Sequence, residues 1–308
     1  MKVKIYVPDI ECDSCITLLR RKFEKAEGIQ GTKFHSDSVE VTFDEAKTNT
    51  KSITDTIQHA GYRASLQPFN KKNLKERKRE FFEHKAKYAL ERNVIKYSLY
   101  IFVILSGLEL IAYFAFLKNI PYFIEKYVWW FAYLNVSIAT LGAALWHFFS
   151  YKAKTTCMLG MMIGMTLGMQ TGMMLGAVLG ATNGLFIGSV VGVITAVSIG
   201  FMTGKCCGIM GILQGMMAGL MGGIMGPMVT LMLFADHLLW FMPLYMLINI
   251  LILWGFSYMI YEEMVENKID VQKVPIPFMR LLLFSTSMAI VLITIMLYGI
   301  KSPLVGGY

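Results

Sequence analysis

Sulfur-bearing side chains recur at regular spacings in two parts of this chain. Near the N-terminus, Cys12 and Cys15 are separated by two residues, so both thiolates can bind one metal ion in a linear or trigonal arrangement. In the apolar part, Cys157 and the adjacent pair Cys206 and Cys207 each begin a methionine-rich segment. Thiolates and thioethers are soft ligands, which favour Cu(I) among common biological metals. These residue types therefore predict binding of a soft metal ion.

The methionines form two series, which we call the ladders. Fifteen of the 23 methionines lie between Met158 and Met232, although methionine specifies the packing of a core poorly. In a helix, sulfurs four residues apart rise about 6 Å per step, which suits an ion that is passed from site to site. The alternative is that these flexible side chains fill space left by glycine. The expected ligands are Met158, Met161, Met162, Met165, Met169 and Met173 in the first ladder and Met210, Met217, Met221 and Met225 in the second.

Glycine accompanies both ladders. From Gly160 to Gly192 it recurs at every fourth residue, and a looser series continues to Gly226. Small residues at this spacing let membrane helices approach until their backbones touch. The pattern predicts that the third, fourth and fifth membrane spans form a tight inner core.

The chain changes character near residue 98, from a charged N-terminal part to a mostly apolar remainder. Its apolar runs are long enough to cross a hydrocarbon layer of roughly 30 Å. We expect an all-α membrane domain over residues 94–308, joined to a small domain at 1–67 by a basic linker at 68–93. The expected spans lie near 94–117, 127–150, 156–179, 182–203, 207–234, 237–262 and 280–300.

Basic residues are distributed unevenly along the chain, whose net charge is +8. With the N-terminus in the cytosol, the cytosolic loops hold six Lys or Arg and the outer side holds three. Residues 71–96 add ten Lys or Arg against four Glu. The positive-inside rule then predicts a multi-pass protein of the plasma membrane with a cytosolic N-terminus. Beside a first span, the basic linker indicates contact with lipid headgroups and not with nucleic acid.

Residues 1–67 have the pattern of a small α+β domain. Strand-like alternation at Val3, Ile5 and Val7 is followed by helical spacing from Ile16 to Ala26. Two more short strands, a second helix ended by Gly61 and a last strand over 62–66 complete the order βαββαβ, which is the ferredoxin-like arrangement. Cys12 and Cys15 fall in the loop that leads into the first helix, whose free N–H groups favour thiolate.

This stretch resembles the heavy-metal-associated domain of copper chaperones and of metal-ATPase N-termini. The matching features are the CxxC at Cys12 and Cys15, its place before the first helix, and the closing Gly61-Tyr62-Arg63-Ala64. The resemblance implies metal binding at the two thiols. The family's Gly-Met-Thr before the first cysteine is here Asp9-Ile10-Glu11, and a carboxylate beside the thiols would favour Zn(II) or Cd(II) over Cu(I). The MxxxM and GxxxG spacings of the membrane part are similar in chemistry to those of eukaryotic high-affinity copper transporters.

Glu109 is the only carboxylate well inside an expected span. Ionisable residues in a membrane are costly and usually functional. We therefore expect Glu109 to couple protons or to contribute to a cation site. The alternative is a structural carboxylate paired with a neighbour such as Asn135 or Tyr113.

These features predict a non-enzymatic transporter of a soft metal ion, most simply Cu(I), with Zn(II), Ag(I) and Hg(II) as other candidates. The ion would pass between Cys12/Cys15 and a path formed by Cys157, Cys206, Cys207 and the ladders. One alternative is mercury(II) uptake, in which the ion passes from thiol pair to thiol pair. Another is a copper sensor or metal-delivery protein that transports nothing. Expected partners are the metal ion, membrane lipid, a cytosolic metallochaperone and further copies of the chain.

Overall fold

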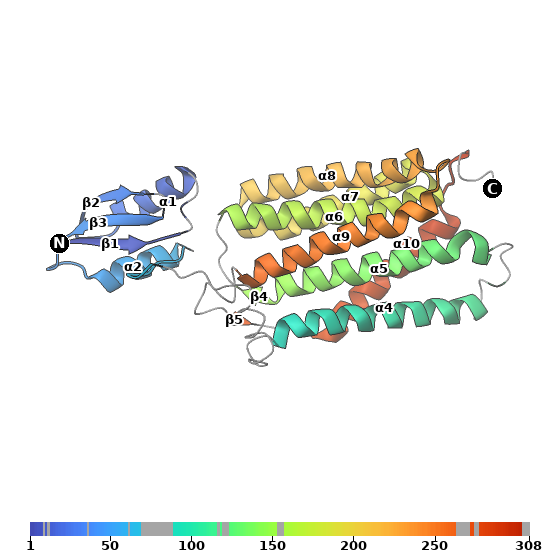
Figure 1. Cartoon of the computed structure of the whole chain (residues 1–308), viewed down its shortest axis with the longest axis horizontal. Coiled ribbons are helices and arrows are strands. Elements are labelled where there is room, and N and C mark those ends of the chain that lie inside the picture. The colour runs from blue at the N-terminus through green and yellow to red at the C-terminus, as the bar shows by residue number, and fades with distance from the viewer. Residues whose placement is uncertain are drawn as a thin grey trace. The chain divides into compact units, whose positions relative to one another are not determined.

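A computed structural model represents this chain as two units, which are described separately (Figure 1). The first contains the N-terminal α+β elements, and the second contains the long helices. The residues that the structure describes are 1–8, 10, 13–35, 37–60, 62–68, 89–115, 118, 123–152, 157–262, 272–273 and 277–303.

The N-terminal unit is an antiparallel sheet packed with two helices. Its elements are β1 (Lys2–Tyr6), α1 (Asp13–Glu24), β2 (Ile29–Phe34), β3 (Ser38–Phe43) and α2 (Thr50–His59). The strand order is β1-β3-β2, so the middle strand is the last of the three in sequence. Helix α2 begins at the cap residue Asn49, whose side-chain oxygen accepts a hydrogen bond from the Ser52 N–H.

Alternating apolar residues of the sheet and one stripe of each helix form the core of this unit. Ile5 and Val39 are cross-strand partners and both are fully buried, as are Leu19 of α1 and Ile57 of α2. The order βαββα agrees with a ferredoxin-like domain, as expected. The expected last strand, over 62–66, is reduced to a single bridge in which Tyr6 and Ser65 exchange backbone hydrogen bonds of 2.8 and 3.1 Å.

The second unit contains seven helices that are long and apolar enough to cross a membrane, counted over the described residues. The chain is therefore a multi-pass membrane protein. Its first helix starts before the expected residue 94, and residues 69–88 of the basic linker lie outside the described part. The helices are α4 (Ala89–Ala115), α5 (Phe123–Phe149), α6 (Cys157–Asn183), α7 (Leu185–Gly204), α8 (Ile209–Met232), α9 (Leu238–Tyr261) and α10 (Phe278–Tyr298).

Glycines bring α6, α7 and α8 into backbone contact, as the four-residue spacing predicts. A Cβ atom added at Gly172 of α6 would lie 2.3 Å from the Gly223 nitrogen of α8. One added at Gly200 of α7 would lie 2.2 Å from the Gly215 oxygen of α8. Figure 1 shows the three helices side by side along their lengths. We call this three-way contact the glycine seam.

Two short strands join the ends of helices that are distant in sequence. β4 (Tyr151–Lys152) follows α5 and pairs antiparallel with β5 (Gln272–Lys273), which precedes α10. This pairing holds the C-terminal end of α5 beside the N-terminal end of α10. The buried residues here include Trp146 of α5 and Leu281 of α10, which belong to the main apolar core of the unit.

Candidate metal-binding sites

Cys15 occupies the first turn of α1, because this helix begins at Asp13 and therefore includes part of the loop that the sequence predicts. Its side chain is only 4% exposed and belongs to the apolar core of the N-terminal unit. The first turn of a helix carries unpaired backbone N–H groups, which favour a negative charge such as a thiolate. The predicted partner, Cys12, lies outside the described residues, as do Asp9 and Glu11. The thiol pair and its neighbouring carboxylates therefore stay predictions.

Cys206 lies in the turn between α7 and α8. The turn is a short 3-10 helix (Lys205–Cys207), and Gly208 follows with a φ of 71°, a left-handed conformation that suits glycine. The Cys206 thiol is exposed and donates a hydrogen bond of 3.2 Å to the Thr203 carbonyl. Cys157 is the first residue of α6, and its side chain lies outside the described set, as does that of Cys207.

The two ladders differ in their exposure. On α8, Met210, Met217, Met221 and Met225 are all exposed, with values between 42% and 63%. On α6, Met158 and Met162 are exposed, whereas Met161, Met165, Met169 and Met173 are half-buried. Glycine, not methionine, occupies the contact between these helices.

The closeness of the glycine seam limits where an ion could travel. Gly222 of α8 approaches the backbone of Met169, and Gly226 approaches the backbone of Met173, at separations too short for an added methyl group. No space for an ion separates α6 and α8 at these points. A path that uses the ladders must therefore run along the exposed face of α8 and past the half-buried methionines of α6, not through the seam. Whether the sulfurs bind metal stays a prediction.

Glu109 of α4 contacts α5 through Asn135. The Asn135 amide nitrogen donates to Glu109 Oε2 over 2.6 Å and lies 3.4 Å from the Ser106 hydroxyl oxygen. Asn135 is one of the two neighbours that the sequence suggests for Glu109, the other being Tyr113. Asn135 is 1% exposed. Its Oδ1 and the second carboxylate oxygen, Glu109 Oε1, are buried without a hydrogen-bond partner among the described residues. Two unpaired oxygen acceptors are suited to a proton or a hard cation.

Comparisons with known proteins concern the N-terminal unit. The mercuric transport protein periplasmic component of Salmonella typhi is 38% identical over 66 residues, which cover 21% of this chain and 72% of that protein. The protein of the same name from Serratia marcescens is 32% identical over the same lengths. The heavy metal-associated isoprenylated plant protein 31 of Arabidopsis thaliana is 28% identical over 69 residues, which cover 22% of this chain and 49% of that protein.

The chain belongs to the heavy-metal-associated domain family through its N-terminal unit. No protein-family model matches the chain. No solved structure matches it either. The similarity covers the heavy-metal-associated domain and leaves the seven helices without a relative among these proteins. The similarity to these proteins supports metal binding by the domain.

Among the residues that the structure describes, no three His, Cys, Asp or Glu side chains are placed to bind one metal ion. Cys15 and Cys206, the two predicted thiols whose side chains the structure describes, therefore belong to no such cluster. One polar contact that the sequence did not indicate joins Tyr151 to Glu91, whose carboxylate accepts a hydrogen bond of 2.5 Å from the tyrosine. Burial, and then the charge of Glu91, raise the pKa of Tyr151 far above its usual range. No spacing links these two residues, so no sequence pattern could have paired them.

Proposed function

We propose that this protein carries a soft heavy-metal ion across a membrane. The observation that supports the proposal is the presence of a heavy-metal-associated domain and seven apolar helices in one chain. A binding domain fixed to a membrane bundle keeps its ion at a high effective concentration near the bundle. The N-terminal relatives are named for mercuric transport, which agrees with this class of function.

In the proposed route, Cys12 and Cys15 bind the ion and exchange it with thiols at the ends of the helices. Cys206 supports this step because its thiol is exposed in a turn, not enclosed in the bundle. Thioethers of the ladders then bind the ion in succession along the exposed face of α8 and the half-buried methionines of α6. Neutral thioethers hold a soft ion less tightly than thiolates do, which suits passage. Cu(I) is the ion that fits this set of ligands best.

Hg(II) is the second candidate cargo. The names of the N-terminal relatives favour it, and thiols alone are enough for it. The two cargoes therefore differ in their need for the ladders.

The deciding experiment measures uptake of Cu(I) and of Hg(II) by vesicles that contain the purified full chain. The variant Met217→Leu/Met221→Leu/Met225→Leu removes three exposed sulfurs of α8 without changing the glycine seam. Met279→Leu is the control, because Met279 is an exposed methionine of α10 outside both ladders.

Loss of Cu(I) uptake only in the triple variant supports the copper route. Unchanged Cu(I) uptake with Hg(II) uptake that depends on Cys206 and Cys207 supports the mercury route. Binding without uptake of either ion would show that the protein is not a transporter.

We further propose that Glu109 couples the movement of protons to the transport of the metal ion. We also propose that the N-terminus is cytosolic. The unpaired oxygens of Glu109 and Asn135 support the first proposal. The excess of basic residues in the loops on one side supports the second.

A further inference from the structure

An apolar crevice opens between α5, α7 and α10. Its volume is about 220 Å³, and its lining includes Phe149 of α5, Thr203 of α7 and Arg280 of α10. These three residues lie at the last turns of α5 and α7 and at the first turn of α10. The crevice therefore begins at one end of the bundle, the end where β4 pairs with β5.

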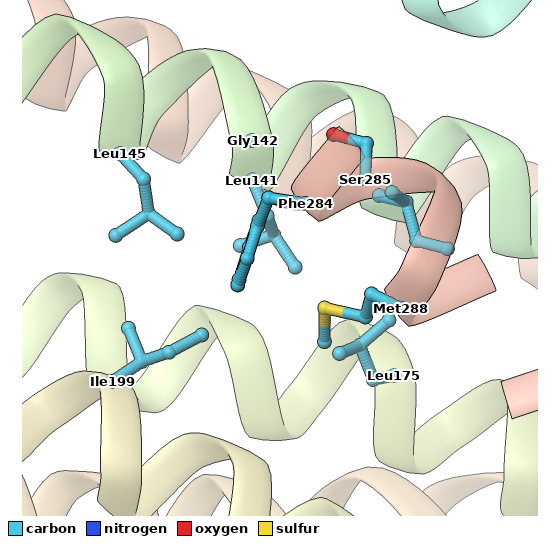
Figure 2. A pocket seen from close by; sticks show the side chains of 9 residues that line it. Leu141, Gly142, Leu145, Leu175, Ile199, Phe284, Ser285 and Met288 are labelled. Atoms are coloured by element: carbon cyan, nitrogen blue, oxygen red, sulfur yellow. The ribbon is translucent and has the colours of Figure 1, made fainter. Parts of the chain in front are cut away.

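Beyond the crevice, along α5 and α10, the packing is nearly closed. A smaller cavity of about 10 Å³ shares Leu145, Ile199 and Phe284 with the crevice. Figure 2 shows the side chains of Leu145, Ile199 and Phe284 around this smaller space, together with Met288. We call the crevice of about 220 Å³ the slot; apart from Thr203 and Arg280, the residues that line it are apolar or aromatic.

The mouth of the slot carries a positive charge. Arg280 is exposed, and it forms no ion pair within the part of the chain that the structure describes, where the only such pair joins His35 and Glu40. The hydroxyl of Thr203 already donates to backbone carbonyls of its own helix. The guanidinium is therefore the one charged group among the residues that line the slot.

We propose that this slot binds one acyl chain of an anionic phospholipid whose phosphate pairs with Arg280. The lining matches a hydrocarbon chain, and the guanidinium matches a phosphate, which it can bind through two parallel hydrogen bonds. Basic pockets between membrane helices are known binding places for such headgroups. A free phosphate would satisfy the arginine but would leave the apolar slot empty. A bound lipid would fill the space between α7, which belongs to the glycine seam, and the pair α5 and α10.

The test compares lipid retention by the purified full chain and its variants in nanodiscs that contain equal amounts of phosphatidylglycerol and phosphatidylcholine. Lipids that remain bound after transfer to detergent are counted by native mass spectrometry. Arg280→Gln removes the charge at the slot, and Lys118→Gln removes one charge from an exposed residue between α4 and α5. We expect the wild type and Lys118→Gln to retain one phosphatidylglycerol, and Arg280→Gln to bind it about tenfold more weakly. Equal retention by all three would overturn the proposal.

A second pair of variants tests the apolar part. Met202→Trp places a large side chain in the slot, because Met202 lines it and is 54% exposed. Met279→Trp makes the same change on an exposed residue that does not line the slot. Only Met202→Trp should lose the lipid. Retention by Met202→Trp, or displacement of the lipid by soluble glycerol phosphate, would show that the slot does not hold the chain. The result does not depend on metal transport.

Discussion

Asn135 of α5 donates a hydrogen bond of 2.6 Å to the carboxylate of Glu109 on α4. This contact joins an acidic side chain within one apolar helix to an amide that is almost fully buried in the next. Asparagine offers one donor and one acceptor group, and only the donor is used here. Asn135 Oδ1 and Glu109 Oε1 therefore remain available to a proton or a cation.

If Glu109 couples protons to metal movement, Glu109→Gln should remove the pH dependence of uptake. Glutamine keeps the shape of the side chain and a hydrogen-bonding oxygen but cannot titrate. The measurement is the initial rate of Cu(I) or Hg(II) uptake into vesicles, assayed from about pH 5.5 to about pH 8. Asn135→Asp serves as a contrast because it keeps the size and removes the donor. A pH profile of Glu109→Gln that matches the wild type would refute the coupling role.

Alanine should not be tolerated in the glycine seam. At Gly200, a Cβ would lie 2.2 Å from a backbone oxygen of α8, so the helices would have to separate. We expect Gly200→Ala to lower the free energy of unfolding by about 3 kcal/mol or more, since overpacked interiors relax poorly. Unfolding by sodium dodecyl sulfate in mixed micelles measures the change.

Gly107 and Gly255 provide the matched controls for that prediction. A Cβ at either position meets no described atom within 4 Å. Alanine there should leave stability unchanged or raise it by up to about 1 kcal/mol, because alanine is the better helix former. If Gly200→Ala were as stable as these controls, the protein would not contain the close backbone contact between α7 and α8.

The heavy-metal-associated domain should account for the tightest metal binding of the full chain. Cys12→Ser/Cys15→Ser should lose one tightly bound Cu(I) or Hg(II) per chain, because hydroxyl oxygen is a poor ligand for soft ions. Metal content after competition with a thiol chelator is the measurement. Cys206→Ser should keep this ion. Loss of the ion from Cys206→Ser alone would place the tight site in the membrane part.

The exposed thiol of Cys206 reports the orientation of the chain in the membrane. In right-side-out vesicles, a membrane-impermeant maleimide should leave Cys206 unlabelled, and it should label Cys206 after the vesicles are opened. Because five cysteines are present, the experiment uses a variant that keeps only Cys206. Labelling before opening would place the turn between α7 and α8, and with it the N-terminus, on the outer side.

Much of the architecture follows from local patterns in the sequence. Alternation around Ile5 and helical spacing around Leu19 define elements that the N-terminal unit contains. Of the expected last strand, the described residues show a single bridge, between Ser65 and Tyr6. The four-residue glycine spacing indicated the tight contact of α6, α7 and α8 correctly, since small residues determine how closely helices approach.

Other features depend on which helices become neighbours. The spacing of Met217 and Met221 shows that they share a face of α8, but it does not show that this face is exposed. Their exposure follows from the glycines, which occupy the opposite, inward side. Arg280 is likewise an ordinary basic residue in the sequence. It borders an apolar slot only because α5, α7 and α10 meet at one end of the bundle.

The glycine seam also determines what holds α6, α7 and α8 together. Burying a side chain costs conformational entropy because its rotamers become fixed. Glycine has no side-chain rotamers, so contact between two glycine faces costs little of this entropy. The cohesion comes from dispersion and weak Cα–H···O contacts between backbones. These three helices can therefore stay associated without any ordered side chains between Gly200 and Gly215, which leaves the exposed methionines of α8 free to rearrange on the outside.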